Sequence, residues 1–200
     1  MNNPDRDTGG TTFTAGGGGA CDADGLLRRI GRGDESAMAA FYREHGRVVL
    51  AQVLLVTGER ALAEEITQDT MLAVWRGADS FRGESSVRSW VIAIARRQTR
   101  DRLRGRRLRL VDDTFLAEQP SSGPGPEATA LDRAELAEVT NAIRELPASH
   151  REVLGLVFSS GLSLPEVAGV LEVPVGTVKS RLSAARAALS RILTEKGQSR

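Results

Sequence analysis

The segment from Gly161 to Leu193 constrains the fold more than any other part of the chain, because it reads as two short helices joined by a tight turn. Ser163 and Glu166 have the three-residue spacing of a capping box, and the intervening proline costs little in a first helical turn. The apolar residues that should face inward in this helix are Val167, Ala168 and Leu171. The pattern predicts a helix-turn-helix.

A second helix is predicted after a turn marked by Pro174 and Gly176, with Thr177 as its cap. Residues three or four apart form one apolar stripe along it: Val178, Leu182, Ala185, Leu189 and Leu193. Basic or small side chains cover the other faces: Lys179, Ser180, Ser183, Ala184, Arg186, Ala187 and Ser190. Small residues let a helix approach a DNA groove, and Lys and Arg contact phosphates or guanine. The pattern favours DNA binding, although an ordinary amphipathic helix with a solvated basic face is the alternative.

Composition indicates an all-α fold. Helix formers dominate the 200 residues, only 4% are aromatic, and no segment has the β-branched alternation of a strand. We predict two small helical domains joined by a flexible linker. The expected parts are a disordered glycine-rich tail over 1–22, a first domain over 25–108, a linker over 109–132, and a second domain over 133–194 with the helix-turn-helix at about 163–186. The run Gly16–Gly19 should not hold a helix, and the stretch Gln119–Glu127 is rich in turn-forming residues.

Basic residues are concentrated in one block, although the net charge is only +1. Between Arg96 and Arg109, eight arginines accompany the single acidic residue Asp101. Such a block suits a polyanionic partner. A solvated helix end is the alternative, and the density of arginine makes it the weaker one.

Several function classes lack the residues that they need. Cys21 is the only cysteine, so a disulfide within one chain and a cysteine-based zinc site are excluded. His45 and His150 are the only histidines, and neither has a metal-spaced or triad partner. We therefore predict no enzyme activity, no metal site and no cofactor. The N-terminus lacks the apolar core of a signal peptide, and no apolar run is long enough for a membrane span. We expect a cytoplasmic protein without direct membrane insertion.

A helix predicted over Gly58–Gly77 has two contrasting faces. Leu62, Ile66 and Ala73 lie on one line and should pack inward, while the polar side carries Glu64, Glu65, Gln68 and Asp69. Met71, Leu72 and Trp75 project near that polar side. Such residues are favoured at the centre of protein interfaces, so this face is either a partner surface or a contact with another helix of the same domain.

The next segment combines a polar loop with a basic helix. The loop Phe81–Ser86 contains small polar groups that can line a pocket for an unstacked base, which is how single strands are read. A helix should begin near Val87. Its buried side should carry Trp90, Val91, Ile94 and Ala95, with Trp90 a core residue rather than a stacking platform, and its outer side Arg88, Arg96, Arg97 and Arg100.

Together these segments resemble the extracytoplasmic-function (ECF) group of bacterial sigma factors of the sigma-70 type. The resemblance rests on FRGESS followed by RSW in the first domain and on VPVGTVKSRL in the second. It covers roughly residues 25–105 and 135–193.

The resemblance implies a protein that binds core RNA polymerase, directs it to promoter DNA and helps to open the duplex, under the control of a cognate anti-sigma factor. The residues implied for core-polymerase binding are Glu65, Gln68, Asp69 and Trp75, which favours the partner surface on that helix. The −10 element, read as a melted strand, is implied to contact Phe81, Ser85, Ser86, Arg88, Arg96, Arg97 and Arg100. The −35 duplex is implied to contact Lys179, Ser180 and Ser183 through bases, and Thr177, Arg181 and Arg186 through phosphates.

Two departures from the family pattern concern which promoter sequence is read. Arg97 stands where the family often has Asn, and Ser183 and Ala184 stand where bulkier or charged residues are common. A repressor or a response-regulator output domain with the same helix-turn-helix is the alternative function. That alternative leaves the first domain without a role, because this domain has no receiver-type βα pattern and no ligand-pocket signature.

Overall fold

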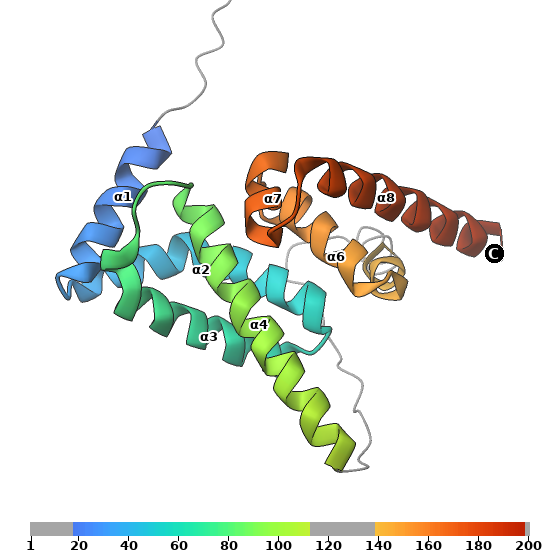
Figure 1. Cartoon of the computed structure of the whole chain (residues 1–200), viewed down its shortest axis with the longest axis horizontal. Coiled ribbons are helices and arrows are strands. Elements are labelled where there is room, and N and C mark those ends of the chain that lie inside the picture. Colours follow the sequence, from blue (N-terminus) through green and yellow to red (C-terminus); the bar gives the residue numbers. More distant parts are fainter. Residues whose placement is uncertain (1–17, 113–138, 199–200) are drawn as a thin grey trace, which may run out of the picture.

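The computed structural model describes residues 18–112 and 139–198, and within these ranges the chain is helical apart from short connections and contains no strand (Figure 1). The first range holds α1 (Gly18–Gly31), α2 (Glu35–Thr57), α3 (Arg60–Gly77), a short 3₁₀ turn η1 (Ala78–Ser80) and α4 (Val87–Asp112). The second holds helical residues 139–145, then α6 (Ala148–Leu154), a π-helical turn η2 (Gly155–Ser159), α7 (Leu164–Leu171) and α8 (Val175–Gln198). The prediction of an all-α fold is confirmed.

The helices form two groups, which we call the N-terminal unit (α1–α4) and the C-terminal unit (residues 139–198) (Figure 1). Helix α4 begins at Val87, as the sequence predicts, but runs to Asp112 and so passes the predicted domain end at residue 108. Most of the predicted linker lies outside the described residues, as does the tail up to residue 17.

Helix α1 begins inside the segment predicted to be a disordered tail. It starts at Gly18, so the prediction that the glycine run holds no helix is wrong for its last two residues. The helix is anchored by Leu27 and Ile30, each only 1% exposed in the core. A glycine in a helix costs about 1 kcal/mol, which lowers helix content without forbidding it next to an anchored turn.

Helix α2 is well defined at both ends. The Asp34 carboxylate caps it by accepting hydrogen bonds from the amides of Ser36 at 2.9 Å and Ala37 at 3.1 Å. Hydrogen bonds from Ser36, Ala37 and Arg29 hold the pKa of Asp34 well below its usual range. Gly58 ends the helix in the left-handed region at φ 71°. These caps fix where α2 begins and ends; the other helices of the N-terminal unit and the C-terminal unit both pack against it.

The inward line of α3 differs from the predicted one. Ile66 is fully buried as expected, but Leu62 and Ala73 are only half-buried. The line that faces the core consists of Ala63, Ile66, Thr67, Thr70, Met71 and Val74. Two threonines are tolerated there because each hydroxyl donates to a backbone carbonyl one turn earlier, at 2.7 Å in both cases. The predicted inward line did not include these two threonines.

The helix-turn-helix forms, with one shift at its second helix. The capping box of Ser163 and Glu166 is present at the start of α7. Helix α8 begins at Val175, and the carbonyl of Pro174 accepts from the amides of Thr177 and Val178. Thr177 therefore lies inside the first turn and is not the cap, and Gly176 belongs to the helix rather than to the turn. The proline starts the helix earlier because its own missing amide needs no partner there.

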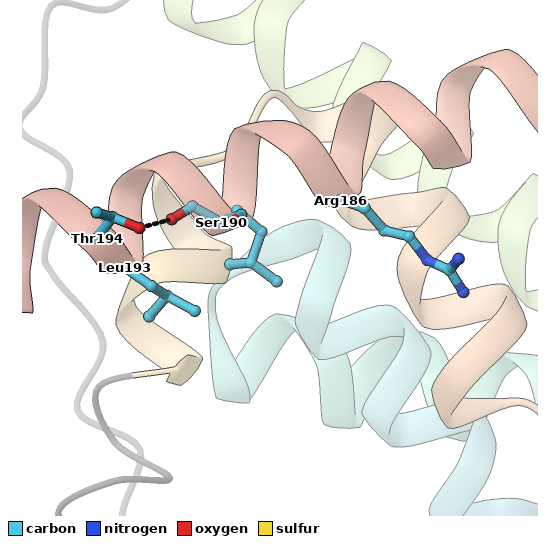
Figure 2. Close-up of a pocket in the computed structure, with 5 residues that line it drawn as sticks. Arg186, Ser190, Leu193 and Thr194 are labelled. Atoms are coloured by element: carbon cyan, nitrogen blue, oxygen red, sulfur yellow. Dashed lines mark hydrogen bonds between the residues drawn. The ribbon is translucent and has the colours of Figure 1, made fainter.

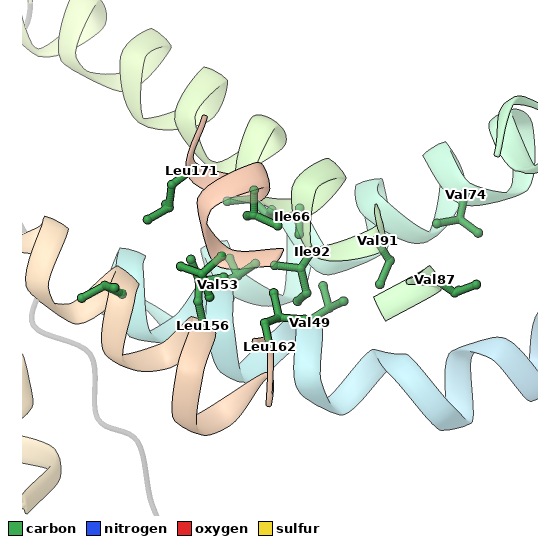
Figure 3. Packing of buried hydrophobic residues seen from close by; sticks show 14 of the residues in the cluster. Val49, Val53, Ile66, Val74, Val87, Val91, Ile92, Leu156, Leu162 and Leu171 are labelled. Carbon is green, nitrogen blue, oxygen red and sulfur yellow. The ribbon is translucent and has the colours of Figure 1, made fainter. Parts of the chain in front are cut away.

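The two units pack directly against each other, which the sequence did not predict. Leu156 and Leu162 of the C-terminal unit, 0% and 5% exposed, belong to one buried cluster with Val49 and Val53 of α2 and Ile92 of α4 (Figure 3). Burial of apolar side chains contributes about 1.5–3 kcal/mol for each residue, so this shared core holds the units together.

His45 is a buried titratable side chain in the N-terminal unit. Its side chain is 2% exposed, its ring lies 4.4 Å from that of Phe41, and neither ring nitrogen has a hydrogen-bond partner among the described residues. Burial lowers the pKa of His45; nearby Glu44 opposes this shift and Arg88 adds to it. A histidine that stays neutral when folded but is protonated when unfolded stabilises the native state above the unfolded pKa, and this contribution falls as the pH drops below it.

We therefore expect the free energy of unfolding to decrease as the pH falls below about 6.5, the pKa of an unperturbed histidine. The variant His45→Leu should have a flatter pH dependence in urea denaturation between about pH 7.5 and 5, since it keeps an apolar side chain of similar size. An equal slope in both proteins would contradict this role of His45.

Candidate partner and nucleic-acid interfaces

An exposed apolar groove lies between α2 and α3. It has a volume of about 900 Å³ and is lined by Glu35, Met38, Ala39, Tyr42, Arg43, Gln68, Met71, Leu72 and Trp75. Tyr42 is 52% exposed and Leu72 is 49% exposed, although both are large apolar side chains. Exposed groups of this kind, rimmed by charges, mark protein interaction sites. Each of the two alternatives for this face applies to a different residue. Met71 is buried against its own domain, whereas Leu72 faces the solvent and is available to a partner.

The four residues predicted to bind a protein partner are not all in this groove. Gln68 and Trp75 line it, whereas Glu65 and Asp69 turn toward α4. The guanidinium of Arg102 donates to both carboxylates at 2.5 Å. The hydrogen bonds that Arg102 donates to Glu65, and then to Asp69, raise its pKa. The acidic cluster thus serves first to hold α3 against α4.

The arginine block is partly neutralised by the same helix pair. Besides Arg102, Arg106 pairs with Glu59 and Arg104 pairs with Asp101 on its own helix. Exposed pairs of this kind contribute about 0–1 kcal/mol each. A polyanion therefore meets fewer free arginines on α4 than the sequence suggests.

The loop before α4 is held by its own contacts. The Ser86 hydroxyl accepts from the amide of Ser89 at 3.2 Å and so caps α4. Phe81 is half-buried with its ring 5.4 Å from that of Trp90 in an edge-on arrangement, while Ser85 and Ser86 are exposed. Trp90 is half-buried and supports the loop, so it is neither a fully buried core residue nor an open stacking platform.

The arginines at the start of α4 differ in their accessibility. Arg97 and Arg100 are exposed, as predicted. Arg88 is also exposed, but it donates to the carbonyl of Ser160 at 3.4 Å. The prediction that Arg96 stays outside is wrong. Arg96 forms an ion pair with Glu152 of α6 at 2.8 Å, and the two side chains are only 17% and 19% exposed.

Helix α8 turns one face to its own unit and the other to the solvent. Val178, Leu182 and Ala185 are buried, while Leu189 and Leu193 farther along the apolar stripe are half-buried. The exposed residues of the predicted reading face are Lys179, Ser180, Ser183, Ala184, Arg186 and Ala187; Thr177 and Arg181 are half-buried. The structure thus brings these residues together on one accessible side of the helix.

Arg186 has an additional contact that the sequence did not reveal. Its guanidinium lies 5.2 Å from the ring centre of Phe158, which is 61% exposed on the π-helical turn. Arg186 also borders a shallow hollow along α8 with Leu189, Ser190, Leu193 and Thr194, where the Thr194 hydroxyl donates to the Ser190 carbonyl (Figure 2). A lone aromatic followed by two serines was the only sequence signal for this feature.

Two kinds of site are not found among the residues that the structure describes. No group of three or more His, Cys, Asp or Glu side chains is placed to hold a metal ion. Within the same residues, no helix combines the length and the apolar character that crossing a membrane requires.

An exposed helix-turn-helix, an arginine-bearing helix behind a polar loop and an apolar partner groove define a two-part DNA-binding protein. Comparison with known protein families identifies the family within this class. The family description Sigma-70 region 2 matches residues 41–109, and Sigma-70, region 4 matches residues 136–189. The chain belongs to the sigma-70 family of RNA polymerase sigma factors, in the ECF group.

Individual relatives agree with this assignment. The RNA polymerase sigma factor NccH of Alcaligenes xylosoxydans xylosoxydans is 34% identical over 85% of this chain and 94% of its own length. The ECF RNA polymerase sigma factor SigL of Mycobacterium tuberculosis is 35% identical over 84% of this chain and 94% of its own. As a sigma factor, the protein binds core RNA polymerase and promoter DNA and acts in transcription initiation; the family is not one of enzymes.

Solved structures are similar over both units. The sigma factor RpoE in complex with the anti-sigma factor NepR from Bartonella quintana has a TM-score of 0.68 at 25% identity, covering 78% of this chain and 96% of that one. The structure of CnrH in complex with the cytosolic domain of CnrY has a TM-score of 0.65 at 26% identity, covering 86% and 97%.

The capping box gives a test of the helix-turn-helix framework. Ser163→Ala removes the hydroxyl that accepts from the Glu166 amide, so the free energy of unfolding measured in urea should fall by about 1 kcal/mol. Ser183→Ala makes the same chemical change at an exposed site and should alter it by less than about 0.5 kcal/mol. Equal losses would show that the cap contributes nothing specific.

Proposed function

We propose that this sigma factor docks on core RNA polymerase through the groove between α2 and α3, with Gln68, Leu72 and Trp75 as contact residues. The exposed apolar groove is the observation that carries this proposal, because Tyr42 and Leu72 are both about half exposed and line the same groove, and grouped apolar side chains of this kind mark interaction sites. Glu65 and Asp69 contribute indirectly, by fixing α3 on α4 through Arg102.

The two DNA elements are assigned to separate units. The −35 duplex is read by the exposed side of α8, with Lys179, Ser180 and Ser183 toward the bases and Thr177, Arg181 and Arg186 toward phosphates. The −10 element is read as a single strand by the loop Phe81–Ser86 and by Arg88, Arg96, Arg97 and Arg100. Cationic groups beside a small polar loop suit an unstacked strand.

The protein is proposed to catalyse no reaction of its own and to work in the cytoplasm. Free energy from binding polymerase and the non-template strand drives local opening of the DNA. A cognate anti-sigma factor is proposed as its regulator. Support comes from the two similar solved structures, in which the sigma factor RpoE is bound to the anti-sigma factor NepR and CnrH is bound to the cytosolic domain of CnrY.

Binding to core polymerase in the absence of DNA tests the function most directly, because a repressor or an output domain does not require it. Gln68→Ala combined with Leu72→Ser should weaken this binding by roughly 2–4 kcal/mol, since truncation of central interface residues has costs of that size. The measurement is a titration of labelled sigma factor with core polymerase, followed by fluorescence anisotropy.

Val139→Ser is the matched control, because Val139 is also exposed, at 38%, and lies outside the groove. The control should bind core polymerase like the wild type. Normal polymerase binding by the groove variant would show that the groove is not part of the polymerase interface. DNA binding by the C-terminal unit should be unchanged in both the groove variant and the control.

Recognition of the duplex is tested at Lys179. Lys179→Ala should weaken binding to the −35 duplex by about 1–3 kcal/mol if the side chain reads a base edge. Lys196→Ala is the control, since Lys196 pairs with Glu145 inside the C-terminal unit. Footprint titration on a promoter is the measurement, and unchanged affinity would exclude Lys179 from the interface.

A further inference from the structure

Three side chains of the proposed −10 surface are already bound by the C-terminal unit. Arg96 pairs with Glu152 in the half-buried ion pair described above. The Ser86 hydroxyl donates to the carboxylate of Glu166 at the start of α7. Arg88 donates to the carbonyl of Ser160. Acceptor oxygens of the C-terminal unit thus bind the side chains with which the N-terminal unit is proposed to hold DNA.

Glu166 is kept ionised at this position. Burial raises the pKa of its carboxyl, but hydrogen bonds from Ser163 and Ser86 and the charge of Arg88 lower it, and the net shift is downward. The Glu166 carboxylate accepts a hydrogen bond from a hydroxyl and lies near an arginine. It thus offers the negative charge and the acceptor oxygens that a DNA phosphate would offer.

The contact between the units is closely fitted around these groups. Gln52 of α2 is 5% exposed and donates to the carbonyl of Glu152 at 3.4 Å, and Arg151 donates to the carbonyl of Val56 at 3.3 Å. Gly155 makes this approach possible. A Cβ atom there would lie 2.3 Å from the Gln52 amide oxygen and 2.6 Å from a methyl carbon of Leu55.

The apolar part of the contact is substantial. Leu156 and Leu162 are buried against α2 and α4, and opening the two units would expose them together with Val49 and Val53 (Figure 3). Docking therefore has an apolar driving force, to which the ion pair of Glu152 and the hydrogen bond of Glu166 add.

We propose that Glu152 and Glu166 act as intramolecular substitutes for DNA phosphates, which hold the C-terminal unit over the −10 surface and exclude single-stranded DNA until the units separate. The masking rests on the −10 role proposed above, whereas the docking itself does not. The two DNA elements are masked unequally, because Lys179, Ser180 and Ser183 stay exposed in the docked state. When the protein binds core polymerase, the two units would separate and the −10 surface would become free to bind the melted strand.

The docked state is tested by energy transfer within the full chain. Labels are placed at two exposed positions, with Arg47→Cys on α2 and Arg191→Cys on α8, in a Cys21→Ser background. The unaltered interface should give one high-transfer population. Glu152→Arg places a cation against Arg96 and should shift most molecules to low transfer, while the swap of Arg96→Glu with Glu152→Arg should restore the high-transfer state.

Gly155→Leu opens the interface without a change of charge, because its side chain would meet Gln52 and Leu55 of the other unit. It should also give the low-transfer population, with helix content retained in circular dichroism. The docked state is refuted if the starting protein already gives low transfer, or if the charge swap behaves like Glu152→Arg.

Masking is tested with a fluorescein-labelled single strand of mixed sequence, about 20 nucleotides long, which exceeds the site size of typical single-strand binders. Glu152→Gln should bind it roughly tenfold tighter than the wild type, because a docked and incompetent majority reduces the apparent affinity. Glu145→Gln has the same change of net charge at an ion pair inside the C-terminal unit and should have a much smaller effect.

Equal affinities for Glu152→Gln and Glu145→Gln would overturn the masking proposal. The −10 role is measured separately in the holoenzyme. There Arg97→Ala should reduce promoter opening while Glu152→Gln does not. Normal opening with Arg97→Ala would count against the proposed −10 surface, and reduced opening together with equal strand affinities would count against masking alone.

Discussion

Helix α2 is buried from two sides, and the rest of the structure depends on this constraint. Its N-terminal half packs into the bundle of α1, α3 and α4 through Ala37 and Phe41, and the following turns carry Val49, Gln52 and Val53 into the contact with the C-terminal unit. The same helix therefore lines the groove proposed to bind polymerase near one end and contacts the second unit near the other. Any movement that separates the units must expose apolar side chains of α2 or find them a new partner.

Helix α4 connects the functions by sharing its arginines among three tasks. Arg102 pairs with Glu65 and Asp69 of α3, and Arg106 pairs with Glu59 at its N-cap. Arg96 pairs with Glu152 of the other unit, while Arg97 and Arg100 stay exposed and are proposed to bind the strand. The charge of the block is thus distributed between folding, docking and binding. Under the proposed −10 role, DNA and carboxylates compete for the same groups, so we expect affinity for the strand to depend on how the two units are arranged.

The sequence predicted local features well and contacts between distant segments poorly. The capping box at Ser163, the start of α4 at Val87 and the buried face of α8 follow from spacing and cap chemistry, which act within a few residues. The pairing of Asp69 with Arg102 and of Arg96 with Glu152 could not be read from the chain, because both depend on tertiary packing. The groove residues Gln68 and Trp75 were found from the mixed face of α3, but Tyr42 was missed because the groove needs a second helix.

We propose that one chain reads two separated promoter elements, one as duplex and one as a melted strand, and that it reads the melted strand only when it is bound to polymerase. Run-off transcription with core polymerase on a randomised promoter library measures this directly. We expect active templates to share two sequence blocks at a constant spacing, with bases of the downstream block reactive to single-strand probes. A single enriched block, or binding to both blocks at equal strength without polymerase, would contradict it.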